Sequence, residues 1–273
     1  MAMFRKKCIG IIGNGFVGSA IAAGFDEVAD VRIYDTQKEK TRDTLGDTVN
    51  ESDFIFICVP TPTLEGGNQH QLYLDVAVTS VIDVAENSKI IVIKSTVVPG
   101  TTRAFAIKFP DHTFLFNPEF LIERDALRSF METDRIIVGG EPGAPMQLIY
   151  DLYQLLFEDE DVPYFRTTWE GAELLKYMAN NFLAVKLAYL NEIYDVAEAL
   201  GVPYTDLRYM FMADSRIGCS HTSVPGPDNY RGFGGTCLPK DLKAFIGWAE
   251  QRCLTTDMCK AAEIVNARVR KEG

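Results

Sequence analysis

The stretch GIIGNGFVGSAIAAGF, residues 10–25, decides the fold that we expect for this chain. Gly13, Gly15 and Gly18 stand in G-x-G-x-x-G register between an apolar, strand-like run and a segment of small and apolar residues typical of a helix. In that context Gly13 permits a tight turn, Gly15 lets a pyrophosphate approach the backbone, and Gly18 lets helix and sheet pack closely. The stretch therefore predicts a strand, turn and helix that bind a dinucleotide.

A carboxylate follows where such a motif needs one. Asp35 ends the next apolar run, near the offset of about 20 residues at which an acidic side chain binds the ribose hydroxyls of the adenosine. A carboxylate there repels a 2′-phosphate, so the pattern predicts NAD rather than NADP. The alternative is a glycine-rich turn that binds nothing, but the strand, the helix and Asp35 together favour the cofactor.

Short apolar runs alternate with helix-length segments through the first half of the chain. The runs are CIGIIG, VRIYD, FIFICVP, IIVIKST, TFLFNP and RIIVGG, at residues 8–13, 31–35, 54–60, 90–96, 113–118 and 135–140. Near-continuous Ile and Val indicate strands covered on both faces, as in a parallel sheet flanked by helices. We predict an α/β fold whose N-terminal domain, residues 1–166, is a Rossmann-type, doubly wound parallel sheet.

The pattern changes after the segment VPYFRTTWEGAEL, residues 162–174. Thr167 and Glu170 have the spacing of a capping box, and a stretch without proline then runs to Leu200. Apolar residues recur along it every three or four positions, which predicts one long helix with a broad apolar surface. We assign residues 167–273 to a helical domain in which this helix connects domains or forms a dimer interface.

Composition excludes several classes of function. The 273 residues are 47% hydrophobic with a net charge of -11, and Lys and Arg are scattered, so we expect no nucleic-acid partner. Apolar runs are far shorter than the roughly 20 residues of a membrane helix, and the N-terminus lacks a signal-peptide pattern, so we expect a soluble, cytoplasmic protein. Six cysteines without a C-x-x-C pair and three scattered histidines predict neither a disulfide framework nor a metal site.

The segment GFGGTCLPKD, residues 232–241, places Cys237 between a glycine-rich bend and a Pro-Lys-Asp. Beside a nicotinamide cofactor, a thiol suggests oxidation of an aldehyde through a covalent thiohemiacetal. The glycines would permit close approach of the substrate, and Lys240 would favour the thiolate or hold a negative charge. The alternative is a small buried hydrophobic residue, the usual state of a free cysteine, which suits Cys8 and Cys58 within their strand runs.

Seven segments in order along nearly the whole chain resemble the UDP-glucose/GDP-mannose dehydrogenase family, and its UDP-glucose branch most closely. They are GNGFVG, CVPTPT, KSTVVPGTT, NPEFLIE, ELLKYMANNFLAVKLAYLNEI, DSRIG and GFGGTCLPKD. The resemblance implies oxidation of a nucleotide sugar at C6 to the uronic acid, with reduction of two NAD and a thioester intermediate. UDP-glucose is the first substrate that it suggests, and GDP-mannose and other UDP-sugars are alternatives.

The resemblance also implies roles for particular side chains. Cys237 matches the family nucleophile. Lys176 and Asn180 match the pair that faces the reacting oxygen, and their i and i+4 spacing puts them on one face of the predicted helix. There the lysine would stabilise oxyanion charge. Without the motif, Lys176 would be interpreted as a solvated helix lysine.

Three further matches complete the implied catalytic set. Asp241 matches the aspartate that organises a water near the thiol together with the lysine, and Thr96 matches the strand-end threonine bonded to it. Glu119 matches the carboxylate that assists thioester hydrolysis as general base. The ordinary alternatives are a strand-capping role for Thr96 and a loop salt bridge for Glu119.

The matched segments also supply the expected linings of both ligand sites. Around NAD we expect Gly13, Gly15, Phe16, Val17, Gly18, Asp35, Pro60, Thr61, Ser95, Thr96 and Lys240. Around the sugar nucleotide we expect Phe120, Leu121, Glu123, Lys176, Asn180, Arg216, Phe233, Gly234 and Lys240. The family arginine that Arg216 matches reaches the site of the other subunit, which implies a homodimer through the long helix.

Family members continue into a second nucleotide-binding domain that holds most of the UDP, and no second βαβ series follows here. We therefore expect this chain to lack that domain, to bind NAD well and UDP-glucose weakly, and to turn over poorly unless another chain supplies the domain. Two other functions stay open. One is an NAD-binding or assembly subunit without turnover, and the other is a hydroxyacid dehydrogenase of the 6-phosphogluconate type, which uses a Lys and an Asn but no cysteine.

Overall fold

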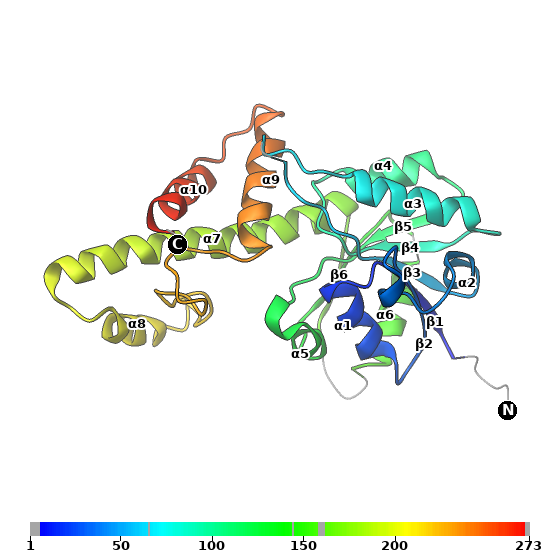
Figure 1. Cartoon of the computed structure of the whole chain (residues 1–273), viewed down its shortest axis with the longest axis horizontal. Coiled ribbons are helices and arrows are strands. Elements are labelled where there is room, and N and C mark those ends of the chain that lie inside the picture. The colour runs from blue at the N-terminus through cyan, green and yellow to red at the C-terminus, as the bar shows by residue number, and fades with distance from the viewer. Residues whose placement is uncertain (1–5, 65, 144, 158–161, 271–273) are drawn as a thin grey trace. The chain divides into compact units, whose positions relative to one another are not determined.

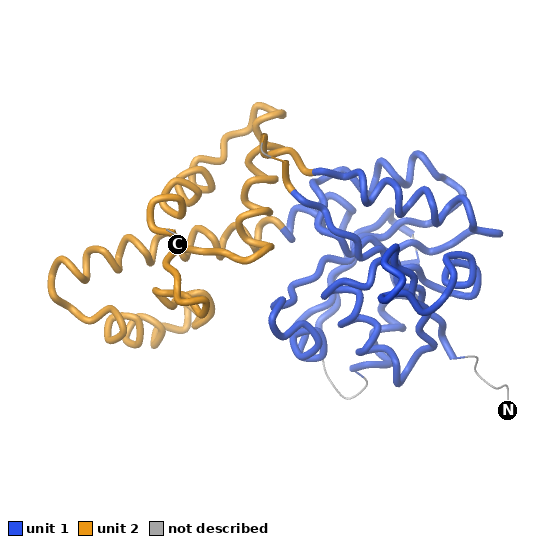
Figure 2. Tube along the Cα trace, in the orientation of Figure 1, with its two compact units in different colours: residues 1–62, 70–176 blue, residues 63–69, 177–273 orange. Residues whose placement is uncertain are grey.

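The computed structural model describes residues 6–64, 66–143, 145–157 and 162–270. The chain divides into two compact units (Figure 2). The first comprises residues 1–62 and 70–176 and contains the sheet, and the second comprises residues 63–69 and 177–273 and is helical. The units divide after Lys176, within a helix, and a short loop belongs to the helical unit. The domain limits drawn from the sequence, residues 1–166 and 167–273, remain a prediction.

Seven strands form one sheet in the order β2-β1-β3-β4-β5-β6-β7. They are β1 (Cys8–Ile12), β2 (Asp30–Tyr34), β3 (Phe54–Ile57), β4 (Ile90–Ile93), β5 (Thr113–Phe116), β6 (Ile136–Gly139) and β7 (Tyr164–Thr167). Neighbours run parallel except β5 and β6, which meet antiparallel at the single pair Phe116 and Gly139. The α/β prediction is confirmed, while β7 and the antiparallel contact were not predicted.

Helices lie on both faces of the sheet (Figure 1), and alternate side chains of the strands enter two cores, one on each face. Ile11, Phe56 and Leu115 pack on one face, and Ile12, Ile57 and Phe116 on the other. The first face is covered by α1 (Phe16–Phe25), α5 (Ala126–Met131) and α6 (Met146–Gln154). The second is covered by α2 (Leu45–Asn50), α3 (Leu72–Val84) and α4 (Thr101–Lys108). Because both faces are covered, the strands β1, β3, β4, β5 and β6 are apolar almost throughout.

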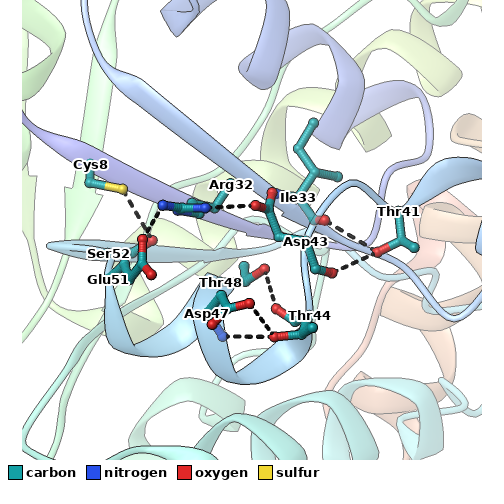
Figure 3. A network of polar contacts seen from close by, with 10 residues as sticks. All are labelled: Cys8, Arg32, Ile33, Thr41, Asp43, Thr44, Asp47, Thr48, Glu51 and Ser52. Carbon is teal, nitrogen blue, oxygen red and sulfur yellow. Dashed lines mark hydrogen bonds and ion pairs between the residues drawn. The ribbon is translucent and has the colours of Figure 1, made fainter.

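A polar network ties the end of β2 to α2 (Figure 3). Arg32 pairs with Asp43 at 2.8 Å and with Glu51. The Thr41 hydroxyl lies 3.2 Å from the carbonyls of Ile33 and Asp43, and it accepts a hydrogen bond from the backbone N–H of Asp35, also at 3.2 Å. The segment after β2 begins with Asp35, and hydrogen bonds of the Thr41 side chain hold it in place.

The predicted long helix is confirmed as α7 (Trp169–Leu200), of 32 residues or about 48 Å. It ends as predicted, because Gly201 adopts φ +67 and its N–H donates to the Glu198 carbonyl at 3.1 Å, as at a helix C-cap. The start differs from prediction: Thr168 rather than Thr167 accepts a hydrogen bond from the N–H of Gly171, at 3.1 Å, because Thr167 is paired in β7. Among the described helices, none has the length and apolarity to cross a membrane.

The helical unit contains most of α7 with α8 (Tyr204–Met212), α9 (Leu238–Glu250) and α10 (Asp257–Val269). Its core joins Ala184 and Leu187 of α7 to Leu242 and Ile246 of α9 and Ala262 of α10. Gly67 packs on α9, since a Cβ on Gly247 would lie only 2.6 Å from the Gly67 carbonyl oxygen. The sheet unit also contains two short 3-10 turns, η1 (Lys38–Lys40) and η2 (Glu123–Asp125).

Candidate functional site

The glycine turn between β1 and α1 has the geometry of an anion cradle. Gly13 adopts φ +94, and a Cβ on Gly18 would lie 2.0 Å from the Gly13 carbonyl oxygen, so both are tightly packed. A Cβ on Gly15 would instead meet no atom within 4 Å. Gly15 precedes α1, where Phe16 and Val17 begin the helix and its free N–H groups attract anions. The turn therefore fits a pyrophosphate at Gly15.

Asp35 is held beside this turn. Its Oδ2 accepts a hydrogen bond from the Asn14 N–H at 2.7 Å, and its Oδ1 accepts one from the Gln37 N–H at 2.8 Å. Each carboxylate oxygen keeps acceptor capacity for a ribose hydroxyl. The buried Oδ1 of Asn14 has no hydrogen-bond partner in the part of the chain that the structure describes. Such an atom beside the glycine turn also fits a polar ligand.

The loops after β3 and β4 are tied together at the carboxyl end of the sheet. The Thr61 hydroxyl donates to the Thr96 carbonyl at 2.7 Å, and the Ser95 hydroxyl donates to the Val59 carbonyl at 2.7 Å. Thr61, Ser95 and Thr96 are buried, whereas Pro60 is exposed. In open α/β sheets, ligands bind at this end of the strands. The loops predicted to line the cofactor are therefore preorganised there.

Lys176 and Glu119 form a buried ion pair. The Lys176 Nζ lies 2.9 Å from Glu119 Oε1, and their side chains are 4% and 6% exposed. Nζ also donates to the Glu119 carbonyl at 2.6 Å, and Glu119 Oε2 accepts from the Leu121 N–H at 2.8 Å. Burial raises the pKa of Glu119, but the Lys176 ammonium and the hydrogen bonds outweigh it and leave this pKa below its usual range. Lys176 is therefore not a solvated helix lysine.

A second buried lysine supports this pair and was not identified from the sequence. The Lys94 Nζ donates to Asn117 Oδ1 at 2.9 Å, and Asn117 and Pro118 directly precede Glu119. Burial lowers the pKa of Lys94 to about 8, with the nearby Glu119 carboxylate opposing. A cavity of about 30 Å³ beside Lys94, Asn117 and Glu119 has room for one water. The sequence signal was a lysine closing the apolar run IIVIKST.

Glu173 is another buried ionisable residue that was not identified from the sequence. It is 0% exposed, and its carboxylate accepts hydrogen bonds from the N–H groups of Gly100, at 2.6 Å, and Thr102, at 2.8 Å. Burial raises the pKa of Glu173 to about 7, and these hydrogen bonds oppose the shift. Through them α7 holds the loop that runs from Thr96 to α4. Its position three residues before Lys176, on the same helical face, was the available signal.

Cys237 precedes α9 in the helical unit and is half-buried. A helix N-terminus favours a thiolate. The cysteines of the sheet differ, because Cys8 and Cys58 are buried, and burial raises the pKa of Cys58 to about 12. Thr236 Oγ1 lies 3.7 Å from the Cys237 Sγ.

A network of polar side chains lies on the first turn of α9. Asn180 Nδ2 donates to Asp241 Oδ2 at 2.6 Å, and the Lys240 Nζ pairs with Asp241 Oδ1 at 2.5 Å. Asp241 is 1% exposed. The Lys240 carbonyl accepts from the Thr63 hydroxyl at 3.0 Å. Two predicted catalytic residues thus meet directly, and Lys240 is paired with one of them.

The remaining predicted residues are distributed as follows. In the sheet unit, Phe120 lies with its ring centre 5.3 Å from the Lys176 Nζ, Leu121 is half-buried and Glu123 is exposed. In the helical unit, Arg216 is 85% exposed at its side chain and pairs with Asp214 at 2.5 Å. There too, Phe233 is buried in the helical core, and Gly234 faces Arg270. The predicted site residues therefore divide into two groups, one in the sheet unit and one in the helical unit.

Comparison with known proteins gives matches to two domain models of one family. Residues 36–157 match the NAD binding domain of the UDP-glucose/GDP-mannose dehydrogenase family, and residues 170–268 match its central domain. The UDP-glucose 6-dehydrogenase of Rickettsia prowazekii is 36% identical over 213 residues, which are 77% of this chain and 48% of that protein. The chain spans about half the length of the curated UDP-glucose 6-dehydrogenases that it matches.

Two solved structures are similar over nearly the whole chain. The UDP-glucose dehydrogenase of the archaeon Pyrobaculum islandicum has a TM-score of 0.85 at 27% identity, covering 98% of this chain and 69% of that one. The UDP-D-ManNAc dehydrogenase of Pyrococcus horikoshii has a TM-score of 0.82 at 25% identity, covering 96% and 68%.

Proposed function

The chain belongs to the UDP-glucose/GDP-mannose dehydrogenase family, and on that premise we propose that it oxidises the C6 alcohol of a nucleotide sugar to the carboxylate, with NAD as hydride acceptor. The observation that best supports this proposal is the buried ion pair of Lys176 and Glu119, in which Nζ lies 2.9 Å from Oε1. A lysine and a carboxylate removed from water are costly to keep for stability alone, which favours a chemical role. UDP-glucose is the first candidate substrate, because it is named in the relatives cited above.

The chemistry requires two oxidations and one hydrolysis. Bound NAD supplies the hydride acceptor for each oxidation. After the alcohol becomes an aldehyde, the Cys237 thiolate adds to the carbonyl carbon and forms a thiohemiacetal. Loss of a second hydride leaves a thioester. Glu119, as general base, takes a proton from a water that attacks the thioester carbon, so that the carbon–sulfur bond breaks and the thiol is restored. One alcohol, two NAD⁺ and one water give one carboxylate, two NADH and three protons.

Other residues would stabilise charge and order water. We assign Lys176 and Asn180 to the oxygen that becomes an oxyanion as the thiolate adds, because an ammonium and an amide N–H both donate to it. Asp241 would hold a water, with Thr96 as its further partner. The binding of NAD rests on Gly15 and Asp35, and a carboxylate at that position favours NAD over NADP.

We also propose that the protein is a homodimer through α7. Its residues in the helical unit expose large apolar side chains, among them Met178 at 67%, Phe182 at 65% and Leu200 at 72%. Soluble monomers seldom leave so long an apolar stripe in water. Light scattering at micromolar concentration should give twice the monomer mass, and Phe182→Glu should shift the mass to that of a monomer. A monomeric wild-type chain would contradict this part of the proposal.

The test is NADH production from a panel of nucleotide sugars by wild type and Cys237→Ala, with NAD and NADP compared as cofactors. The wild-type enzyme should release two NADH per UDP-glucose, and Cys237→Ala should lose net acid formation. Cys253→Ala is the matched control, because Cys253 is exposed and lies outside the proposed site. Turnover that survives Cys237→Ala would instead favour a hydroxyacid dehydrogenase, which needs no thiol.

A further inference from the structure

The backbone before Cys237 is clamped by a side chain from the far end of the chain. Asn266, on α10, accepts a hydrogen bond at its Oδ1 from the Phe233 N–H at 2.7 Å. Its Nδ2 donates to the Phe233 carbonyl at 3.0 Å. One side-chain amide therefore satisfies both backbone polar groups of one residue, as a neighbouring β-strand would.

A second asparagine holds the residue just before. The Gly232 N–H donates to Asn191 Oδ1 at 3.0 Å, and Asn191, on α7, is 0% exposed. Gly232 adopts φ +71, and a Cβ there would lie 2.2 Å from Asn266 Oδ1. The glycine is therefore required by its positive φ and by the close approach of Asn266.

The segment between Phe233 and Cys237 is packed unevenly. A Cβ on Gly234 would lie 2.1 Å from Arg270 Nη2, so this glycine packs on the guanidinium. A Cβ on Gly235 would meet nothing within 4 Å, and Thr236 is exposed. Cys237 then begins the turn of α9. Two fixed points flank this segment, the clamped peptide at Phe233 and the first turn of α9.

We propose that Asn266 is a positioning residue for Cys237: by holding both polar groups of Phe233 it fixes the loop that presents the nucleophile. This inference rests on the proposed role of Cys237. A side-chain amide suits the task because it offers a donor and an acceptor without charge. Displacement of a reacting group by about 1 Å costs roughly 10²-fold in rate. Loss of the clamp therefore lowers kcat and leaves NAD binding unchanged.

The test compares Asn266→Ala and Asn266→Asp with Ala267→Ser, an exposed neighbour on α10. Amide hydrogen exchange of residues 231–237 should quicken roughly tenfold in Asn266→Ala, which loses both hydrogen bonds to Phe233. It should quicken less in Asn266→Asp, which keeps an acceptor for the Phe233 N–H and loses only the donor to the Phe233 carbonyl. With UDP-glucose and NAD, kcat should fall by about 10²-fold. In Asn266→Asp the new carboxyl opposes the Phe233 carbonyl when ionised and donates to it when protonated. Its protection relative to Asn266→Ala should therefore return at low pH, which a purely structural defect would not do.

Activity is measured below the melting temperature of each variant, with circular dichroism and NAD titration reporting the folded protein. Unchanged exchange at residues 231–237 would overturn the clamp. Faster exchange with unchanged kcat in folded protein would overturn the positioning role. If Cys237→Ala keeps full turnover, the proposed function fails separately, and exchange in the Asn266 variants still decides whether the clamp exists.

Discussion

Lys176 and Glu119 are nearly excluded from water and meet at 2.9 Å, whereas Cys237 is half-buried and follows an exposed Gly235 and Thr236. The sheet unit thus fixes charged groups by burying them against each other. In the helical unit, the side-chain amides of Asn191 and Asn266 hold the backbone of an uncharged loop at residues 232–233. The difference follows from the proposed tasks: a charged pair gains strength in a dry setting, while a nucleophile has to stay reachable.

Thiol reactivity should separate the two regions by the widest margin. Iodoacetamide at pH 8 with peptide mapping should label Cys237 first, because the N-terminus of α9 favours its thiolate. Cys58 should react about 10³-fold more slowly than an ordinary thiol, because burial raises its pKa to about 12 from 9.0. Faster labelling of Cys253 or Cys259 than of Cys237 would show that the motif cysteine is not the activated one.

Breaking the buried pair should cost both stability and rate. Lys176→Met leaves the Glu119 carboxylate buried without its ammonium, and removal of one partner of such a pair costs about 3–5 kcal/mol. The free energy of unfolding in urea should fall by about that amount, and turnover with UDP-glucose by about 10²-fold or more.

The double variant Lys176→Met/Glu119→Gln separates these two losses. It removes both charges, so much of the stability should return while turnover stays low. A stability unchanged by Lys176→Met alone would contradict the buried pair and, with it, the contrast between the two regions.

A smaller effect concerns Glu173, a buried carboxylate held by backbone N–H groups instead of a lysine. Burial raises its folded pKa to about 7 from 4.5, so the folded state binds more protons than the unfolded state between these values. Its contribution to stability is full below about pH 4.5 and is lost as the pH rises through 7. Urea unfolding at pH 5 and pH 8 should show wild type losing about 1–3 kcal/mol more than Glu173→Gln over this interval.

Equal losses in the two proteins would mean that Glu173 is not kept protonated by burial. Glu170→Gln is the matched control, since Glu170 lies on the same helix but is partly exposed and pairs with Arg103. The pKa of Glu170 lies below its usual value because of that arginine. Glu170→Gln keeps Glu173, so it should lose as much stability between pH 5 and pH 8 as wild type does.

Local signals in the sequence were sufficient for the main elements. Apolar runs marked the strands β1 to β6, because strands covered on both faces exclude polar residues. The helix α7 and its end at Leu200 followed from apolar spacing and from Gly201, since only local backbone geometry is involved. The resemblance to the family, carried by seven ordered segments, was confirmed by matches to its NAD binding and central domains.

Other elements depended on partners remote in the chain. The strand β7 is YFRT, with three exposed residues and no apolar run, and it exists because β6 offers an edge for pairing. The loop of residues 63–69 joined the helical unit through Gly67 and Gly247, a contact that no local pattern announces.

The polar side chains that orient the proposed site show the same limit. A lysine such as Lys94 at a strand end, or an asparagine such as Asn266 in EIVNARV, has the same local sequence whether it faces water or a buried group. What Asn266 binds was decided when α10 packed against α9 and brought its amide to Phe233, 33 residues away in the chain. Hydrogen-bond partners are chosen by the packing of elements, so the sequence by itself determined which residues could react, and only the tertiary structure determined what holds them.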